Sequence, residues 1–104
     1  MSVLFTERIK ELHINSQLPQ RKLAAALDID TATYCKIERG ERKARKDQVR
    51  QLEMLFNVKT NELLTLWLAD RVSDIVSEEE NVAYGALSIA VEKYKEEYGK
   101  VKVI

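Results

Sequence analysis

The 104-residue chain is poor in the residue types that build disulfide frameworks, metal centres and tight turns. It has one Cys, Cys35, and one His, His13, so it can form neither an internal disulfide nor an ordinary zinc site. Three Gly and one Pro leave few residues for turns and therefore favour long helices. No apolar run approaches a membrane span, and residues 1–12 lack the long apolar stretch of a signal peptide. We therefore expect one small cytoplasmic protein with no cofactor, no metal and no membrane partner.

The chain is neutral overall, but its charge is divided between its two halves. Residues 1–50 hold 11 Lys and Arg against 7 Asp and Glu, a net charge of +4. Residues 51–104 hold 6 against 10, a net charge of −4. The first half therefore suits a polyanion such as nucleic acid, and the second half is better suited to contacts with protein.

The segment 20–40, QRKLAAALDIDTATYCKIERG, predicts two short helices joined by a tight turn. We expect the first helix over 19–27 and the second over 31–39. The positions expected to face inward are Leu23, Leu27, Tyr34 and Ile37. Small residues at 24–26 keep the first helix slim, so that another helix can approach it closely. This is the pattern of a helix-turn-helix, whose second helix can enter the major groove of DNA.

The residues that bound these two helices support the same prediction. Pro19 is tolerated in the first turn of a helix, where its missing N–H is not needed. Asp28 tolerates the left-handed conformation that the turn requires, and Asp30 is a good N-cap for the second helix. Gly40 then ends the second helix.

Further helices are predicted on both sides of this unit. Apolar spacing indicates a helix over about 4–15, another over 46–56, and a third that starts near Thr60 and carries apolar residues as far as Val76. Ser77 with Glu80 is typical of a capping box, and predicts a last helix over about 78–98. The apolar pattern after residue 64 is longer than a DNA-binding core needs.

The chain resembles the Cro/repressor-type helix-turn-helix regulators of bacteria, the XRE family, over about residues 5–64. The resemblance rests on FTERIKEL, PQRKLAAALDID, TYCKIERGER and NELL, which follow the family pattern in register without a gap. It implies an all-α fold: a five-helix Cro/repressor-like DNA-binding bundle that binds operator DNA, usually as a dimer. We therefore expect residues 1–69 to form the helix-turn-helix domain. We expect residues 70–104 to add a C-terminal helix similar to the extensions that some members use for dimerisation.

Three positions depart from the family pattern. Pro19 stands where Ser or Thr is usual, and Asp28 stands where Gly is common. His13 stands where many members have an Arg that pairs with the Glu matching Glu38. A protonated His13 can replace that Arg, whereas a neutral His13 can only donate or accept a hydrogen bond, so the pair is expected to depend on pH.

The resemblance also implies which residues contact DNA. The base readers would be the outward residues at the start and middle of the second helix: Thr31, Ala32, Thr33 and Lys36. Thr and Ala methyls suit a thymine methyl, and Lys suits guanine O6 and N7. The phosphate contacts would come from the start of the first helix and from the basic run after the second: Gln20, Arg39, Arg42, Lys43, Arg45 and Lys46. The alternatives are that the Thr residues only open a helix and that the cations are solvated surface charges.

The last two helices offer candidate dimer contacts instead of a chemical site. The predicted interface residues are Trp67, Val72, Ile75, Val82, Leu87, Ile89 and Tyr94. Aromatic residues at such positions are more typical of core or interface packing than of a ligand site. For Cys35 a half-buried filler is favoured over a redox switch, and for Glu78–Glu80 a capped first turn is favoured over a metal site.

These observations predict a sequence-specific regulator that acts as a homodimer on an operator with two half-sites. A controller of a restriction-modification system is one narrower role. The antitoxin of a toxin–antitoxin module, with a C-terminal helix that binds the toxin, is an alternative. An adaptor that has lost DNA binding is another. We identify no nucleophile–base–acid set, phosphate loop or metal cluster, so no catalytic residue is proposed.

Overall fold

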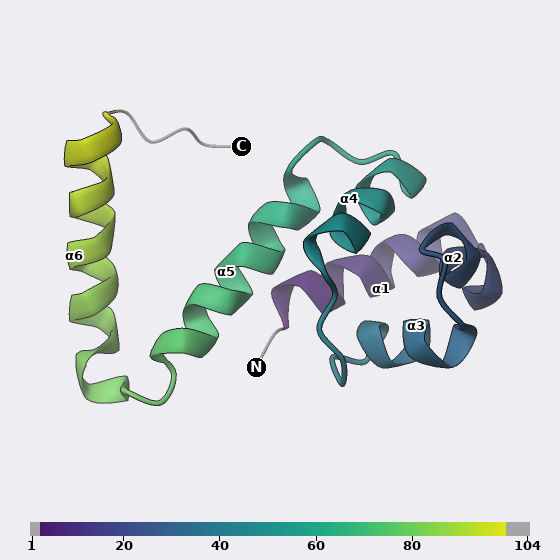
Figure 1. Ribbon diagram of the computed structural model, residues 1–104, viewed down its shortest axis with the longest axis horizontal. Helices are drawn as coiled ribbons and strands as arrows, with labels where there is room; N and C mark the ends of the chain where they lie inside the picture. The colour runs from purple at the N-terminus through teal and green to yellow at the C-terminus, as the bar shows by residue number, and fades with distance from the viewer. Residues whose placement is uncertain (1–2, 100–104) are drawn as a thin grey trace.

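The computed structural model describes residues 3–99, and within this range the protein forms six α-helices and no strand (Figure 1). The helices are α1 Leu4–Ser16, α2 Gln20–Ala26, α3 Thr31–Glu38, α4 Lys46–Leu55, α5 Glu62–Val76 and α6 Glu80–Tyr98. The prediction of an all-α bundle with an added C-terminal helix is therefore confirmed. Residues 100–104, the end of the predicted extension, lie outside the described residues.

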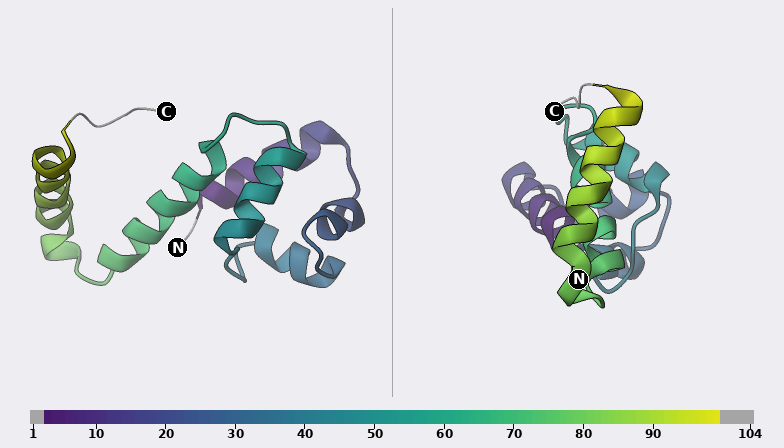
Figure 2. Two further views of the ribbon diagram at one scale, coloured as in Figure 1. Left: turned by 45° about the horizontal axis from the view of Figure 1, so that its top comes forward. Right: turned by 90° about the vertical axis from the view of Figure 1, so that its left-hand side faces the viewer.

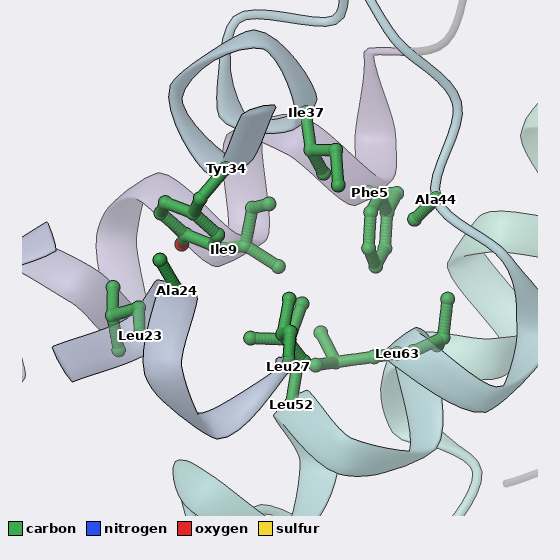
Figure 3. Close-up of a cluster of buried hydrophobic side chains, with 11 residues drawn as sticks. Phe5, Ile9, Leu23, Ala24, Leu27, Tyr34, Ile37, Ala44, Leu52 and Leu63 are labelled. Atoms are coloured by element: carbon green, nitrogen blue, oxygen red, sulfur yellow. The ribbon is translucent and has the colours of Figure 1, made fainter. Parts of the chain in front are cut away.

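The first five helices pack around one apolar core (Figure 3). The four positions of α2, α3 and the turn between them that were expected to face inward are all buried. The core is completed from the other helices and from one loop; its members are Phe5, Ile9, Leu23, Ala24, Leu27, Tyr34, Ile37, Ala44, Val49, Leu52 and Leu63. Each buried Leu or Ile contributes about 1.5–3 kcal/mol. Of the three small residues at 24–26 only Ala24 is buried, so the slim face of α2 is narrower than expected.

The ends of α2 and α3 follow the predicted turn chemistry, with one difference at Pro19. Asp28 has φ 57° and Gly40 has φ 80°, both in the left-handed region. Asp30 caps α3, because its Oδ1 accepts a hydrogen bond from the Thr33 N–H at 2.7 Å. Pro19 is the extended N-cap of α2 and not part of its first turn, so α2 begins at Gln20.

The start of α6 also differs from the prediction. Ser77 ends α5: its hydroxyl donates to the Asp74 carbonyl at 2.8 Å. The N-cap of α6 is Glu79, which makes no side-chain capping bond. The expected capping box is therefore wrong, because the preceding helix takes the hydroxyl that would have formed it.

Two buried carboxylates cap helices from a distance. Asp70 of α5 accepts hydrogen bonds at the start of α1, from the Leu4 N–H at 3.2 Å and from the Phe5 N–H at 2.9 Å. Glu53 of α4 accepts from the Leu64 N–H in the first turn of α5 at 3.0 Å. α1 has no side-chain cap at Val3, so Asp70 serves as the acceptor for its first N–H groups. Together the bonds of Asp70 and Glu53 link α1 and α4 to α5. α5 crosses the predicted division between residues 69 and 70 without a break.

α6 stands apart from the bundle, to which the end of α5 connects it (Figures 1 and 2). No residue of α6 is buried. The arrangement resembles a V with α5 as one arm and α6 as the other. Within residues 3–99 we find no helix long and apolar enough to cross a membrane.

Candidate nucleic-acid interface

The inward face of α3 is fully anchored, which fixes the direction of its outward face. Tyr34 and Ile37 are 0% and 1% exposed and pack in the core. Burial raises the pKa of the Tyr34 hydroxyl above its ordinary value, so the phenol stays neutral. On the outward side Thr31, Ala32 and Lys36 are exposed, whereas Thr33 is half-buried. Three of the four predicted base readers are thus open to a ligand, and the fourth is less accessible.

A polar contact joins the end of α3 to α1. His13 Nδ1 lies 3.0 Å from both carboxylate oxygens of Glu38, and His13 Nε2 lies 2.9 Å from the Leu18 carbonyl. This is the pair that the family resemblance implied, with His in place of Arg. Both partners of the ring are acceptors, so His13 donates to both only when both nitrogens carry protons. The contact holds α3 against α1 and against the loop that leads into α2.

A second polar contact joins α2 to α3. The Cys35 thiol donates a hydrogen bond to Gln20 Oε1 at 3.1 Å. The amide oxygen of Gln20 is therefore engaged within the chain, while its NH₂ group remains available to donate to an anion. The sequence signalled Gln20 and Cys35 separately, but their contact spans 15 residues and has no periodic pattern.

The basic loop folds back onto the end of α3. The backbone N–H groups of Glu41 and Arg42 donate to the Lys36 carbonyl at 2.8 Å and 3.2 Å. Hydrogen bonding to Thr33 keeps the pKa of Asp30 below its ordinary value, with smaller contributions from the positive charges of Lys36 and Arg42. Arg42 is thus near enough to the start of α3 for its charge to be felt there.

The remaining cations of the loop fall into two groups. Arg39 pairs with Glu41 at 2.7 Å, and Arg45 pairs with Asp47 at 3.2 Å. The side chains of both pairs are more than half exposed, so water and salt screen their attraction and a phosphate can compete for either Arg. Lys43 and Lys46 are exposed, as is Arg42. The six predicted phosphate-contact residues are all on the surface.

The predicted dimer residues do not share one environment. Trp67 packs against the core of its own chain: its Nε1–H donates to the Ala44 carbonyl at 2.9 Å, and the Arg71 guanidinium lies 4.7 Å from its ring centre. The other six lie on α5 and α6, where Leu87 is half-buried and the rest are exposed; the exposed ones are Val72, Ile75, Val82, Ile89 and Tyr94. Tyr84 and Tyr98, which the sequence also indicated as candidates for core or dimer packing, are exposed as well. Sequence reasoning did not include Leu68 and Val91 in the interface set, although both are apolar and exposed.

A small all-helical protein with an anchored, outward-facing second helix and a basic loop after it has the design of a helix-turn-helix DNA-binding domain. The family model described as helix-turn-helix matches residues 9–63, more than half of the chain. The chain therefore belongs to this family, the Cro/repressor-type (XRE) helix-turn-helix regulators, whose domain binds DNA and is not catalytic. No curated protein and no solved structure matches the chain. The matched range ends at the second residue of α5, and so leaves most of α5 and all of α6 outside the family domain.

Proposed function

We propose that this regulator recognises a specific operator with two half-sites, which it binds as a homodimer in the cytoplasm. The observation that carries the proposal is the orientation of α3. Tyr34 and Ile37 hold one face in the core, so Thr31, Ala32 and Lys36 project outward beside the basic loop. In this role the outward residues of α3, with Thr33, read base edges in the major groove. The half-sites are expected about one helical turn, roughly 34 Å, apart.

The basic loop and Gln20 are proposed to hold the sugar-phosphate backbone. The NH₂ group of Gln20 is positioned by Cys35, and the exposed cations are Arg42, Lys43 and Lys46. Arg39 and Arg45 can add phosphate contacts by exchanging their exposed carboxylate partners. If each protomer neutralises about four phosphates, a dimer is expected to show a log–log salt slope of about −7.

The second part of the chain is proposed to be the dimerisation segment, residues 70–104. Its support is the set of exposed apolar residues on α5 and α6. The biological setting stays open between two narrower roles: control of a restriction-modification system, and an antitoxin whose C-terminal helices bind a basic toxin. Gene neighbourhood distinguishes them, because a methyltransferase gene next door favours the first and a small toxin gene favours the second.

Selection of bound sequences from a random duplex pool tests the proposal directly. A motif with two equal halves supports a dimeric, sequence-specific regulator. Lys36→Ala is expected to relax discrimination at one base position by about 1–3 kcal/mol. Arg42→Ala is expected to weaken all sequences alike and to lower the salt slope by about 1 per protomer. Lys59→Ala is the control, because the α4–α5 turn lies across the bundle from α3 (Figure 1).

Two results would contradict the proposed DNA-binding function. An adaptor without DNA binding would show no salt-dependent binding to random duplex even at low salt. Equal effects of Lys36→Ala and Arg42→Ala on specific and random DNA would contradict the division into base and phosphate contacts.

A further inference from the structure

A cavity of about 570 Å³ lies where the basic loop between α3 and α4 passes the start of α1 and the middle of α5 (Figure 1). Its floor is apolar, because the buried residues Phe5, Ile37 and Ala44 close it toward the core (Figure 3). Trp67 forms part of the wall on the side of α5. Sites for small molecules are typically hollows of roughly 300–1,000 Å³ that combine apolar walls with a few polar groups. The cavity has the volume and the apolar floor of such a site.

Trp67 is held in position by both sides of the cavity. Its Nε1–H donates to the Ala44 carbonyl at 2.9 Å, and the Arg71 guanidinium lies 4.7 Å from its ring centre. The hydrogen bond connects α5 to the basic loop. A molecule that packs beside the indole would therefore contact the side chain that positions this loop.

The charged groups around the cavity leave an excess of positive charge. Five cations and three carboxylates line it. Both oxygens of Asp70, one of the carboxylates, already accept backbone hydrogen bonds at the start of α1. Arg39 pairs with Glu41, whereas the other four cations form no ion pair with a carboxylate within residues 3–99; they are Lys10, Arg42, Lys43 and Arg71. A hollow with such an excess of one sign favours a ligand of the opposite charge.

DNA binding accounts for only part of this charge. Arg42 and Lys43 belong to the proposed phosphate contacts of the basic loop. Lys10 and Arg71 do not, and they line the walls that α1 and α5 form. The planar guanidinium of Arg71 suits the paired oxygens of a carboxylate or a phosphate, and Trp67 beside an apolar floor suits a flat apolar body.

We propose that this cavity binds a small organic anion and that the bound anion weakens DNA binding. The apolar body of the anion packs beside Trp67, and its acidic head binds Arg71. Arg42 and Lys43 line the same cavity and are also exposed at the surface, so an anion inside and a DNA phosphate outside compete for their charges. Linkage requires that DNA weakens binding of the anion by the same factor. This regulation rests on the proposed function of the basic loop, whereas binding of the anion does not.

The single tryptophan of the chain allows the site to be observed directly. In ¹H–¹⁵N spectra of the full-length protein, the one indole N–H resonance belongs to Trp67. Naphthalene-2-carboxylate and 2-naphthyl phosphate are expected to shift this resonance until it saturates, and to bind at least about tenfold more tightly than the neutral naphthalene-2-carboxamide. The tighter of the two acids identifies the preferred head group. The site is overturned if neither acid shifts the resonance at millimolar concentration, or if the carboxamide binds as tightly as the acids.

Substitution of Arg71 tests the anchor of the acidic head. Arg71→Gln is expected to weaken binding of both acids by about tenfold or more, and Arg71→Lys, which keeps the charge without the planar fork, is expected to lose less. Lys59→Gln is the matched control, because Lys59 is also an exposed cation but does not line the cavity. Urea unfolding checks that the variants remain folded. Equal binding by Arg71→Gln and Lys59→Gln would contradict the assigned anchor.

Fluorescence anisotropy with a labelled random duplex measures the effect on DNA. A saturating acid probe is expected to weaken binding by at least about tenfold and to lower the salt slope by about 1 for each cation that it withdraws. Sodium acetate at the same concentration controls for ionic strength. Because Arg71 is not among the proposed DNA contacts, Arg71→Gln should bind the duplex as the wild type does and should resist release by the probe.

The outcomes separate this inference from the proposed function. Unchanged DNA affinity in the presence of a probe that shifts the Trp67 resonance would overturn the regulation and leave the site. No shift of the resonance, with normal salt-dependent DNA binding, would overturn the site and leave the regulator intact. A chain that binds no duplex at low salt would overturn the proposed function and with it the regulation, while the titration of Trp67 would still decide whether the site exists.

Discussion

The buried carboxylate of Asp70 offers the sharpest test of how this bundle is held together. Asp70 is 3% exposed and accepts two backbone hydrogen bonds at the start of α1, where Val3 provides no side-chain cap. The bond from the Phe5 N–H is buried, whereas the bond from the Leu4 N–H is only partly so. Asp70→Ala would therefore remove the acceptor of a buried N–H group, that of Phe5. We expect this substitution to weaken the attachment of α1 to α5.

The size of the effect follows from the two bonds. A buried donor left unpaired costs about 1–3 kcal/mol. Loss of a negative charge at a helix N-terminus adds about 0.3–1 kcal/mol. Asp70→Ala should thus lower the free energy of unfolding by about 3 kcal/mol, or the Tm by roughly 12–24 °C for a domain of this size. Asp70→Asn keeps one acceptor oxygen and should cost about half as much.

Urea unfolding followed by circular dichroism measures these differences at one fixed protein concentration, because association also stabilises the folded state. Glu7→Gln is the matched control: Glu7 is an exposed carboxylate in the first turn of the same helix, so its loss should cost at most about 1 kcal/mol. The reasoning fails if Asp70→Ala unfolds within 1 kcal/mol of the wild type, or if Asn is no better than Ala at this position.

Three further predictions concern the polar contacts around α3. His13→Ala removes the contact between His13 and the half-buried carboxylate of Glu38 and should cost about 1–3 kcal/mol, whereas His13→Arg should retain most of the stability. Urea unfolding compares the two variants, and equal losses of stability would show that the pair is not needed. Cys35→Ala removes the hydrogen bond that positions the side chain of Gln20, and should weaken binding to all DNA sequences by a few-fold. Cys35→Ser keeps a hydrogen-bond donor and should bind DNA more tightly than the Ala variant. Fluorescence anisotropy titration measures both affinities. The folded-state pKa of Asp30 is lowered, so its capping contribution is complete above the ordinary value of 3.8 and is lost as the pH falls through the folded-state value. Asp30→Asn, whose amide cannot titrate, should therefore lose less stability than the wild type on acidification, and parallel acid unfolding curves would contradict this.

Local patterns predicted the elements that depend on neighbouring residues. The inward positions of α2 and α3 follow from apolar spacing, and the conformations of Asp28, Asp30 and Gly40 follow from turn and cap chemistry. These features involve residues within a few positions of one another, which is the range that periodicity and capping rules describe. The base-reading set came from the family pattern and stays a prediction.

Contacts between distant segments could not be predicted in the same way. The bond between Asp70 and Phe5 spans 65 residues, and Trp67 donates to a carbonyl 23 residues away. Such partners leave no periodic signal. The position of Asp70 in the sequence did nevertheless indicate a buried carboxylate. Asp70 lies seven residues after Leu63 and therefore on the side of α5 that faces the core, where a carboxylate needs a hydrogen-bond partner. At Ser77 the local pattern gave a wrong prediction. Its hydroxyl could cap the start of α6 or bond to the end of α5, and the contact with the Asp74 carbonyl shows that it does the second.

α5 extends well beyond the matched family range, and this determines where a shortened chain can end without loss of stability. A fragment that stops at residue 69 would include all of the matched family range, yet it would lack Asp70, whose carboxylate accepts the hydrogen bond from the Phe5 N–H in the first turn of α1. A fragment that stops after Ser77 would keep that carboxylate and the hydroxyl that terminates α5. A fragment made to study the DNA-binding domain alone should therefore end beyond the matched family range. In a fragment that lacks Asp70, the start of α1 would be destabilised, and weaker DNA binding could reflect this loss of stability and not the loss of a DNA contact.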